Sequence, residues 1–277
     1  MSFWKLINFE LKRLVIPFVA MVVLTAVIQL IGVYVTANRF VDAVKDVMDD
    51  EKIPNFEQFA LLKGESTFSH AMDQSIWITA PVLLCIAFLI IYLFFTWYRE
   101  WLGRRSFIVR LLTLPNSRMI IYWSKLVSFL LAVFGLVAAQ LPLLKIEQAL
   151  YYQLVPDVLV RDFPVDISIA NNTLLNILLP PAFSDFMLFY GVGIAAVLVL
   201  TTIILLERSY RIVGIIVGLA YGTAVFFLFL MPVIMLIDRT SRFFPKELLA
   251  MGIGVVIFVA ALSIWWSSFL LRKKITV

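Results

Sequence analysis

The sequence predicts an all-α integral membrane protein that crosses the bilayer six times. Of its 277 residues, 62% are hydrophobic and only 15% are charged, and the mean hydropathy is +0.99. A soluble domain is about half apolar and about a quarter charged, because polar residues must cover its outside. This chain carries too much apolar surface for a water-exposed globule, so lipid is its expected solvent.

Six stretches are long enough to cross the hydrocarbon core, which takes about 20 apolar residues. Their backbone groups must form hydrogen bonds within each stretch, so we expect helices. None has a charge at its centre, where one costs about 2.5–3.5 kcal/mol, and Lys125 and Asp185 lie near span ends. Within a single domain of residues 1–277, the predicted spans are 14–35, 76–97, 120–144, 183–206, 212–237 and 248–271.

The distribution of basic residues predicts the orientation of these spans. With the N-terminus in the cytoplasm, 14 of the 23 Lys and Arg residues but only three of the 18 Asp and Glu residues lie on the cytoplasmic side. Short cytoplasmic loops are enriched in Lys and Arg. We therefore expect a multi-pass protein of the cell membrane with both termini in the cytoplasm. The overall positive charge follows from this bias, and we expect no nucleic-acid partner.

Two long segments are then expected outside the membrane. Residues 37–75 are acidic and contain Pro54, where we expect a helix to break. Residues 145–182 are more mixed. Their apolar stretch 172–179 ends in two prolines and is too short to cross the bilayer. We expect a re-entrant or interfacial helix there.

Residues 1–13 differ from the spans because their apolar residues lie on one helical face and Lys5, Asn8 and Lys12 on another. This pattern predicts an amphipathic interfacial helix, with the lysines directed toward anionic lipid headgroups. The alternative is a basic flank that only orients the first span.

The cytoplasmic segment 98–119 is the most informative part of the chain. It combines five arginines with apolar residues such as Trp101 and Phe107 that are costly to expose to water. A hydrophobic patch with an arginine rim is typical of a docking surface for another protein. A loop whose apolar residues lie back on the bilayer explains the same composition equally well.

The residue pattern of this segment resembles the ABC transporter permeases of the type-2 exporter family. Arg99-Glu100 is followed by a basic stretch, then by Leu-Thr-Leu-Pro-Asn-Ser-Arg ending at Arg118, with Lys125 seven residues later. In that family the segment joins the second and third spans, and its coupling helix binds a separate ATPase subunit. The resemblance implies an ATPase-coupling role for Arg99, Glu100, Arg104, Arg105, Arg110, Leu112, Thr113, Leu114, Pro115 and Arg118.

The resemblance also implies the partners, the cofactors and the activity of the protein. The partners are cytoplasmic ABC ATPase subunits and a second permease subunit, identical or related, that completes a dimer. ATP and Mg²⁺ are expected on the partner ATPase, with no cofactor on this chain. The expected activity is export of a hydrophobic or amphipathic cargo, such as a peptide, an antibiotic or a lipid-like molecule. The alternative is a non-transporting sensor or assembly protein with an acidic extracellular loop.

The motifs of other functional classes are missing from the sequence. There is no GxxxxGK[ST] phosphate-binding loop, so we expect no ATP hydrolysis on this chain and no enzyme activity of its own. His70 is the only histidine and Cys85 the only cysteine, which argues against a metal site, a catalytic triad or a disulfide. No acidic residue lies at mid-membrane, which disfavours an ion-coupled carrier.

A few residues within the spans can line a pathway or pack helices together. Gln29 and Gln140 are the most polar residues deep in their spans, and either pathway lining or an interhelical hydrogen bond explains them. Gly214, Gly218 and Gly222 form two overlapping GxxxG units, which allow another helix to approach closely. We expect that helix to belong to the same subunit rather than to a neighbour.

Overall fold

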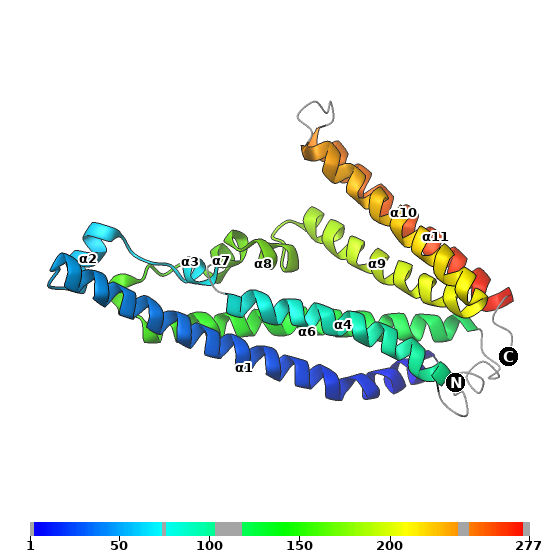
Figure 1. The fold of residues 1–277 in the computed structure, drawn as a ribbon, viewed down its shortest axis with the longest axis horizontal. Helices are drawn as coiled ribbons and strands as arrows, with labels where there is room; N and C mark the ends of the chain where they lie inside the picture. The colour runs from blue at the N-terminus through cyan, green and yellow to red at the C-terminus, as the bar shows by residue number, and fades with distance from the viewer. Residues whose placement is uncertain (1–2, 74–75, 103–117, 238–243, 274–277) are drawn as a thin grey trace. The chain divides into compact units, whose positions relative to one another are not determined.

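The computed structural model describes residues 3–73, 76–102, 118–237 and 244–273 (Figure 1). These residues form helices joined by short connections, and the one strand-like contact in these ranges is an isolated bridge between Ser66 and Val160. The predicted all-α fold class is therefore confirmed.

Six helices in the described part of the chain are long and apolar enough to cross a membrane, and each contains one of the predicted spans. The chain is thus a multi-pass membrane protein. The six helices are α1 (Phe3–Glu51), α4 (Ile76–Leu102), α6 (Arg118–Leu154), α9 (Phe183–Tyr210), α10 (Ile212–Ile237) and α11 (Pro245–Lys273).

Helices α1 and α6 continue well past their predicted spans. α1 runs on from Val35 to Glu51, and α6 runs on from Leu144 to Leu154. Hydropathy marks only the length that contacts hydrocarbon, whereas a helix continues as long as its side chains pack favourably. The break expected at Pro54 is confirmed, because α1 ends just before it.

The segment predicted to be an interfacial helix forms the first turns of α1 and continues without a break into the span. Leu6, Ile7 and Glu10 are buried on one face of these turns, whereas Trp4 is 75% exposed. A polar residue, Glu10, therefore lies on the buried face, which the amphipathic pattern did not predict.

Contacts within the described chain group it into two compact units. The first unit comprises residues 1–10, 93–130 and 182–277, and the second comprises residues 11–92 and 131–181. The single permease domain expected from the sequence stays a prediction.

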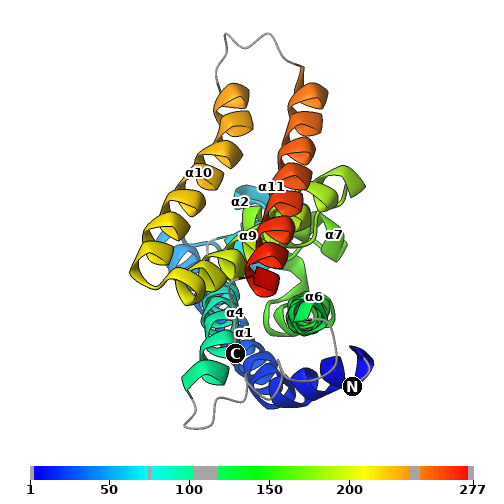
Figure 2. The same cartoon turned by 90° about the vertical axis from the view of Figure 1, so that its right-hand side faces the viewer.

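In the first unit, α9 packs against both α10 and α11, which also contact each other (Figure 2). Their shared apolar core includes Ala195 of α9, Tyr221 of α10 and Val259 of α11. Buried hydroxyl groups add hydrogen bonds between the helices: Tyr221 Oη lies 2.7 Å from Ser263 Oγ, and Thr202 Oγ1 lies 2.9 Å from Ser267 Oγ. Such bonds satisfy polar groups that would otherwise be exposed to hydrocarbon.

The three glycines of the GxxxG units lie on the face of α10 that packs against α9. A Cβ atom at Gly214 would lie 2.0 Å from the backbone oxygen of Leu206, and one at Gly218 would lie 3.0 Å from Ile203 Cγ2. A Cβ atom at Gly222 would lie 3.2 Å from Ile203 Cδ1. The missing side chains therefore allow close packing of two helices of the same subunit.

Replacing Gly214 with Ala should destabilise this helix pair, because a backbone oxygen cannot move aside as a flexible side chain can. We expect Gly214→Ala to lower the free energy of unfolding in detergent by about 1–3 kcal/mol, the usual cost of overpacking. Gly254→Ala is the matched control, since a Cβ atom there meets nothing within 4 Å. Equal stability of the two variants would contradict the close α9–α10 contact.

The second unit contains the middle and later turns of α1, the first part of α4, most of α6, and a group of short helices. These are α2 (Phe56–Lys63), α3 (Phe68–Asp73), the 3-10 helix η1 (Asp157–Leu159), α7 (Val165–Asn171) and α8 (Thr173–Leu178). Backbone bonds from Ser66 N to Leu159 O (2.8 Å) and from Arg161 N to Ser66 O (3.0 Å) connect the two predicted outer segments.

An apolar core extends through this unit from α1 and α6 into the short helices. Ala37 of α1, Leu144 of α6 and Leu175 of α8 are all at most 1% exposed within it. Asn172 accepts a hydrogen bond from Leu175 N and so caps α8. The apolar stretch predicted at 172–179 thus forms a short helix whose buried residue joins the core.

Candidate coupling site at the ends of α4 and α6

The predicted coupling segment 98–119 begins on the last turn of α4, which ends at Leu102, and it ends on the first turn of α6, which begins at Arg118. Among its predicted residues, Arg104, Arg105, Arg110, Leu112, Thr113, Leu114 and Pro115 lie outside the described residues. Glu100 and Arg118 lie on the two helices, and only their backbone is described. The contacts that the structure does describe are those of the helix ends on either side.

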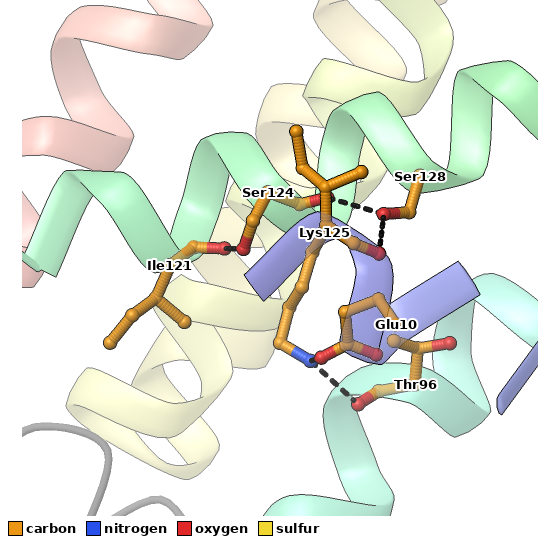
Figure 3. A network of polar contacts seen from close by, with 7 residues as sticks. Glu10, Thr96, Ile121, Ser124, Lys125 and Ser128 are labelled. Carbon is orange, nitrogen blue, oxygen red and sulfur yellow. Dashed lines mark hydrogen bonds and ion pairs between the residues drawn. The ribbon is translucent and has the colours of Figure 1, made fainter. Parts of the chain in front are cut away.

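Lys125, seven residues into α6, forms a buried ion pair with Glu10 of α1 (Figure 3). Lys125 Nζ lies 3.1 Å from Glu10 Oε1, and the two side chains are only 2% and 6% exposed. The same ammonium group donates a hydrogen bond to the backbone oxygen of Thr96 in α4 at 3.4 Å. One side chain therefore connects the N-terminal turns of α1, the end of α4 and the start of α6.

Other contacts reinforce this connection between the same three helices. Ser128 Oγ donates to the backbone oxygens of Ser124 (2.8 Å) and of Ile7 in α1 (3.4 Å). Lys125 Nζ also lies 5.7 Å from the ring centroid of Trp97, within the range of a cation–π interaction. The ion pair thus belongs to a buried polar network rather than to a solvent-exposed surface.

The burial of this pair gives it a large influence on stability. A buried ion pair adds little net stability over an apolar pair, but removing one partner leaves an uncompensated charge and costs about 3–5 kcal/mol. Glu10 Oε2 has no hydrogen-bond partner among the described residues, so the carboxylate depends on Lys125. The three helix ends are therefore expected to move together.

The end of α4 also contacts the end of α9. Tyr98 Oη donates a hydrogen bond to Glu207 Oε2, and the guanidinium carbon of Arg208 lies 4.5 Å from the centroid of the Tyr98 ring. Arg99, the one predicted coupling residue whose side chain is described, lies 5.2 Å from the centroid of Phe95. The end of α4, which precedes the predicted coupling segment, is thus held by polar and aromatic contacts. The start of α6, which follows the segment, is held by the Lys125 contacts.

Gln29 and Gln140, predicted as pathway-lining or packing residues, contact each other in the second unit. Gln140 Nε2 donates to Gln29 Oε1 at 3.2 Å, and the two side chains are buried. Of the two roles left open by the sequence, the structure therefore contains the interhelical hydrogen bond, between α1 and α6.

Sequence reasoning missed the role of Glu10 and the partner of Lys125. Glu10 was counted only among the charges of the cytoplasmic side, and Lys125 was named only as a span-end charge and as part of the residue pattern of the predicted coupling segment. A usable signal was present, because Glu10 follows Leu6 by four residues and precedes Leu14 by four, which places it on the apolar face of a helix. A charged residue on such a face requires a buried partner of opposite charge.

No family model, curated protein or solved structure matched this chain in the comparisons made with each. The class that the fold and the site define is a multi-pass helical membrane protein with a buried ion pair near the end of α4 and the start of α6. Any narrower assignment depends on the residues themselves.

Proposed function

We propose that this chain is the transmembrane permease subunit of an ATP-driven ABC exporter, whose ATPase is a separate cytoplasmic protein. The observation that carries the proposal is the arginine-rich segment 99–118 between the second and third apolar helices, followed by Lys125. Six apolar helices and the first turns of α1 are compatible with the same family plan.

The Lys125 network supports a mechanical role for this segment. A segment that receives force from a motor must pass it on to helices that do not slip past one another. Lys125 bonds both to Glu10 and to the Thr96 backbone, so a displacement of the segment would be transmitted to the ends of α1, α4 and α6 together. Packed, hydrogen-bonded helices transmit such shifts as rigid bodies.

In the proposed cycle, two ATPase subunits bind ATP and Mg²⁺, close, and displace the coupling segments of two permease subunits. The pathway between the subunits then opens outward and releases its cargo. This change requires that the ATPase contacts differ between the two states. Few charges lie within the spans, which suits a hydrophobic or amphipathic cargo. The proposed site of action is the cell membrane, with both termini and the coupling segment in the cytoplasm.

The proposal is tested by purifying the tagged full-length chain from membranes of its source cells and assaying the eluate for ATP hydrolysis. We expect a soluble ATPase to copurify, and the Glu100→Ala/Arg104→Ala double variant to retain several-fold less of it, because both charges lie in the predicted docking segment. Lys45→Ala, an exposed residue paired with Asp42 far along α1, is the control and should retain it fully. Absence of an ATPase from the unmodified chain, or full retention by the double variant, would reject the proposal.

A further inference from the structure

The second unit contains a cavity of about 330 Å³ whose walls come from α1, α4, α6 and α8. Its polar lining residues are Thr25, Cys85 and Gln140, and the rest of its lining is apolar. Thr25 Oγ1 and Cys85 Sγ lie 3.1 Å apart and form a hydrogen bond with each other, and the Gln140 amide donates a hydrogen bond to Gln29. Ordered water needs about two to four polar partners, so this lining favours an apolar occupant.

The cavity is continuous with the lipid-facing surface of the helices. Two of its lining residues within the predicted spans, Ile86 of α4 and Pro142 of α6, are exposed on the outside of their helices. Because these helices belong to a multi-pass membrane protein, the medium at this opening is the hydrocarbon of the bilayer. The molecules with direct access to the cavity are therefore lipids.

The depth of the cavity corresponds to one leaflet. Its lining on α6 extends from Val133 to Ile146, which is about 20 Å along a helix, compared with about 15 Å for half of the hydrocarbon core. On α1 it begins at Val22, in the middle of the predicted span, and at its other end it includes Leu178 of α8. The cavity thus extends from mid-membrane to the side on which the short helices lie.

The volume is sufficient for a substantial apolar group. A buried apolar cavity of about 150 Å³ admits benzene, and ligand pockets begin at about 300 Å³. A long, apolar, laterally open cavity of one-leaflet depth matches the shape of a single alkyl chain better than that of a compact ligand.

We propose that this cavity binds one acyl chain of a bilayer lipid from the leaflet on the side of the short helices. The methyl end of the acyl chain lies near Val22 and Leu89, and its carbonyl end lies near Ile146 and Leu178. The bound chain fills the space between α1, α4 and α6 and keeps these helices at a fixed separation. This inference does not depend on the proposed transport function, since it requires neither an ATPase nor a cargo.

Two adjacent alanines of α6 provide a matched pair of variants for the test. Ala139 lines the cavity, whereas Ala138 is exposed on the helix surface. A tryptophan at position 139 should occupy the space of the chain, while one at position 138 should only add to the lipid-facing surface. Ala26→Phe, on the α1 wall of the cavity, supplies a second blocking variant if Ala139→Trp does not fold.

The experiment reconstitutes the full chain in nanodiscs of phosphatidylcholine that contain a small fraction of the same lipid with a diazirine at mid-chain. After illumination, mass spectrometry locates and quantifies the adducts. We expect adducts concentrated on cavity-lining residues of α4 and α6, at least about fivefold fewer of them in Ala139→Trp or Ala26→Phe, and no decrease in Ala138→Trp. Adducts spread evenly over exposed residues such as Ile91 and Phe226, or equal yields from blocking and control variants, would overturn the proposal.

Discussion

Replacing Lys125 with Met should lower the free energy of unfolding of the protein in detergent by about 3–5 kcal/mol. The substitution keeps a long apolar side chain but leaves the Glu10 carboxylate buried with no opposite charge. The loss is measured by chemical unfolding of the purified chain, with helix content followed by circular dichroism.

Two further variants separate the effect of burial from that of charge. Lys63→Met removes the partner of Glu51 in a pair whose side chains are 45% and 46% exposed, and it should cost at most about 1 kcal/mol. The double variant Glu10→Leu/Lys125→Met removes both buried charges and should be more stable than Lys125→Met alone. If Lys125→Met costs no more than Lys63→Met, the ion pair is not buried as described.

Replacing Glu147 with Met should raise the free energy of unfolding, whereas most substitutions of buried residues lower it. Glu147 is 0% exposed, and neither of its carboxyl oxygens has a hydrogen-bond partner among the described residues. It lies on the same stripe of α6 as Leu144 and Tyr151, both fully buried in the apolar core of the second unit. Met has a similar length and removes the unsatisfied polar group, which typically costs about 1–3 kcal/mol.

The control for this prediction is Glu65→Met, an exposed carboxylate in the same unit, which should change stability by at most about 0.5 kcal/mol. If chemical unfolding in detergent shows Glu147→Met to be about 1–3 kcal/mol more stable than the unmodified protein, the Glu147 carboxyl group is retained at the expense of stability. A loss of stability greater than 1 kcal/mol would show instead that Glu147 has a favourable partner.

The sequence predicted the apolar part of the fold well, because the cost of burying charge in hydrocarbon leaves a clear pattern. Every predicted span falls within one long helix. The extension of α1 from Val35 to Glu51 was not predicted, because those turns are stabilised by packing against residues distant in sequence, such as Leu144 and Tyr151. Hydropathy contains no information about such partners.

The candidate site was predicted in part. The position of segment 98–119 between two long helices followed from the apolar stretches on either side of it, and Lys125 was named as part of its residue pattern. The coupling role of the segment stays a prediction. The partner of Lys125, Glu10, was not identified, because the two residues are 115 positions apart and only the folded chain brings them together. The same holds for Gln29 and Gln140, whose mutual hydrogen bond could not be chosen over pathway lining from one sequence.

The central claim is that the segment between α4 and α6 lies in the cytoplasm, where a separate ATPase can bind it. Single cysteines introduced by Ser106→Cys and Asp50→Cys into a Cys85→Ser background test this claim with a membrane-impermeant maleimide. We predict that intact cells label position 50 but not 106, and that inverted membrane vesicles label 106 but not 50. Labelling of position 106 in intact cells would contradict the account.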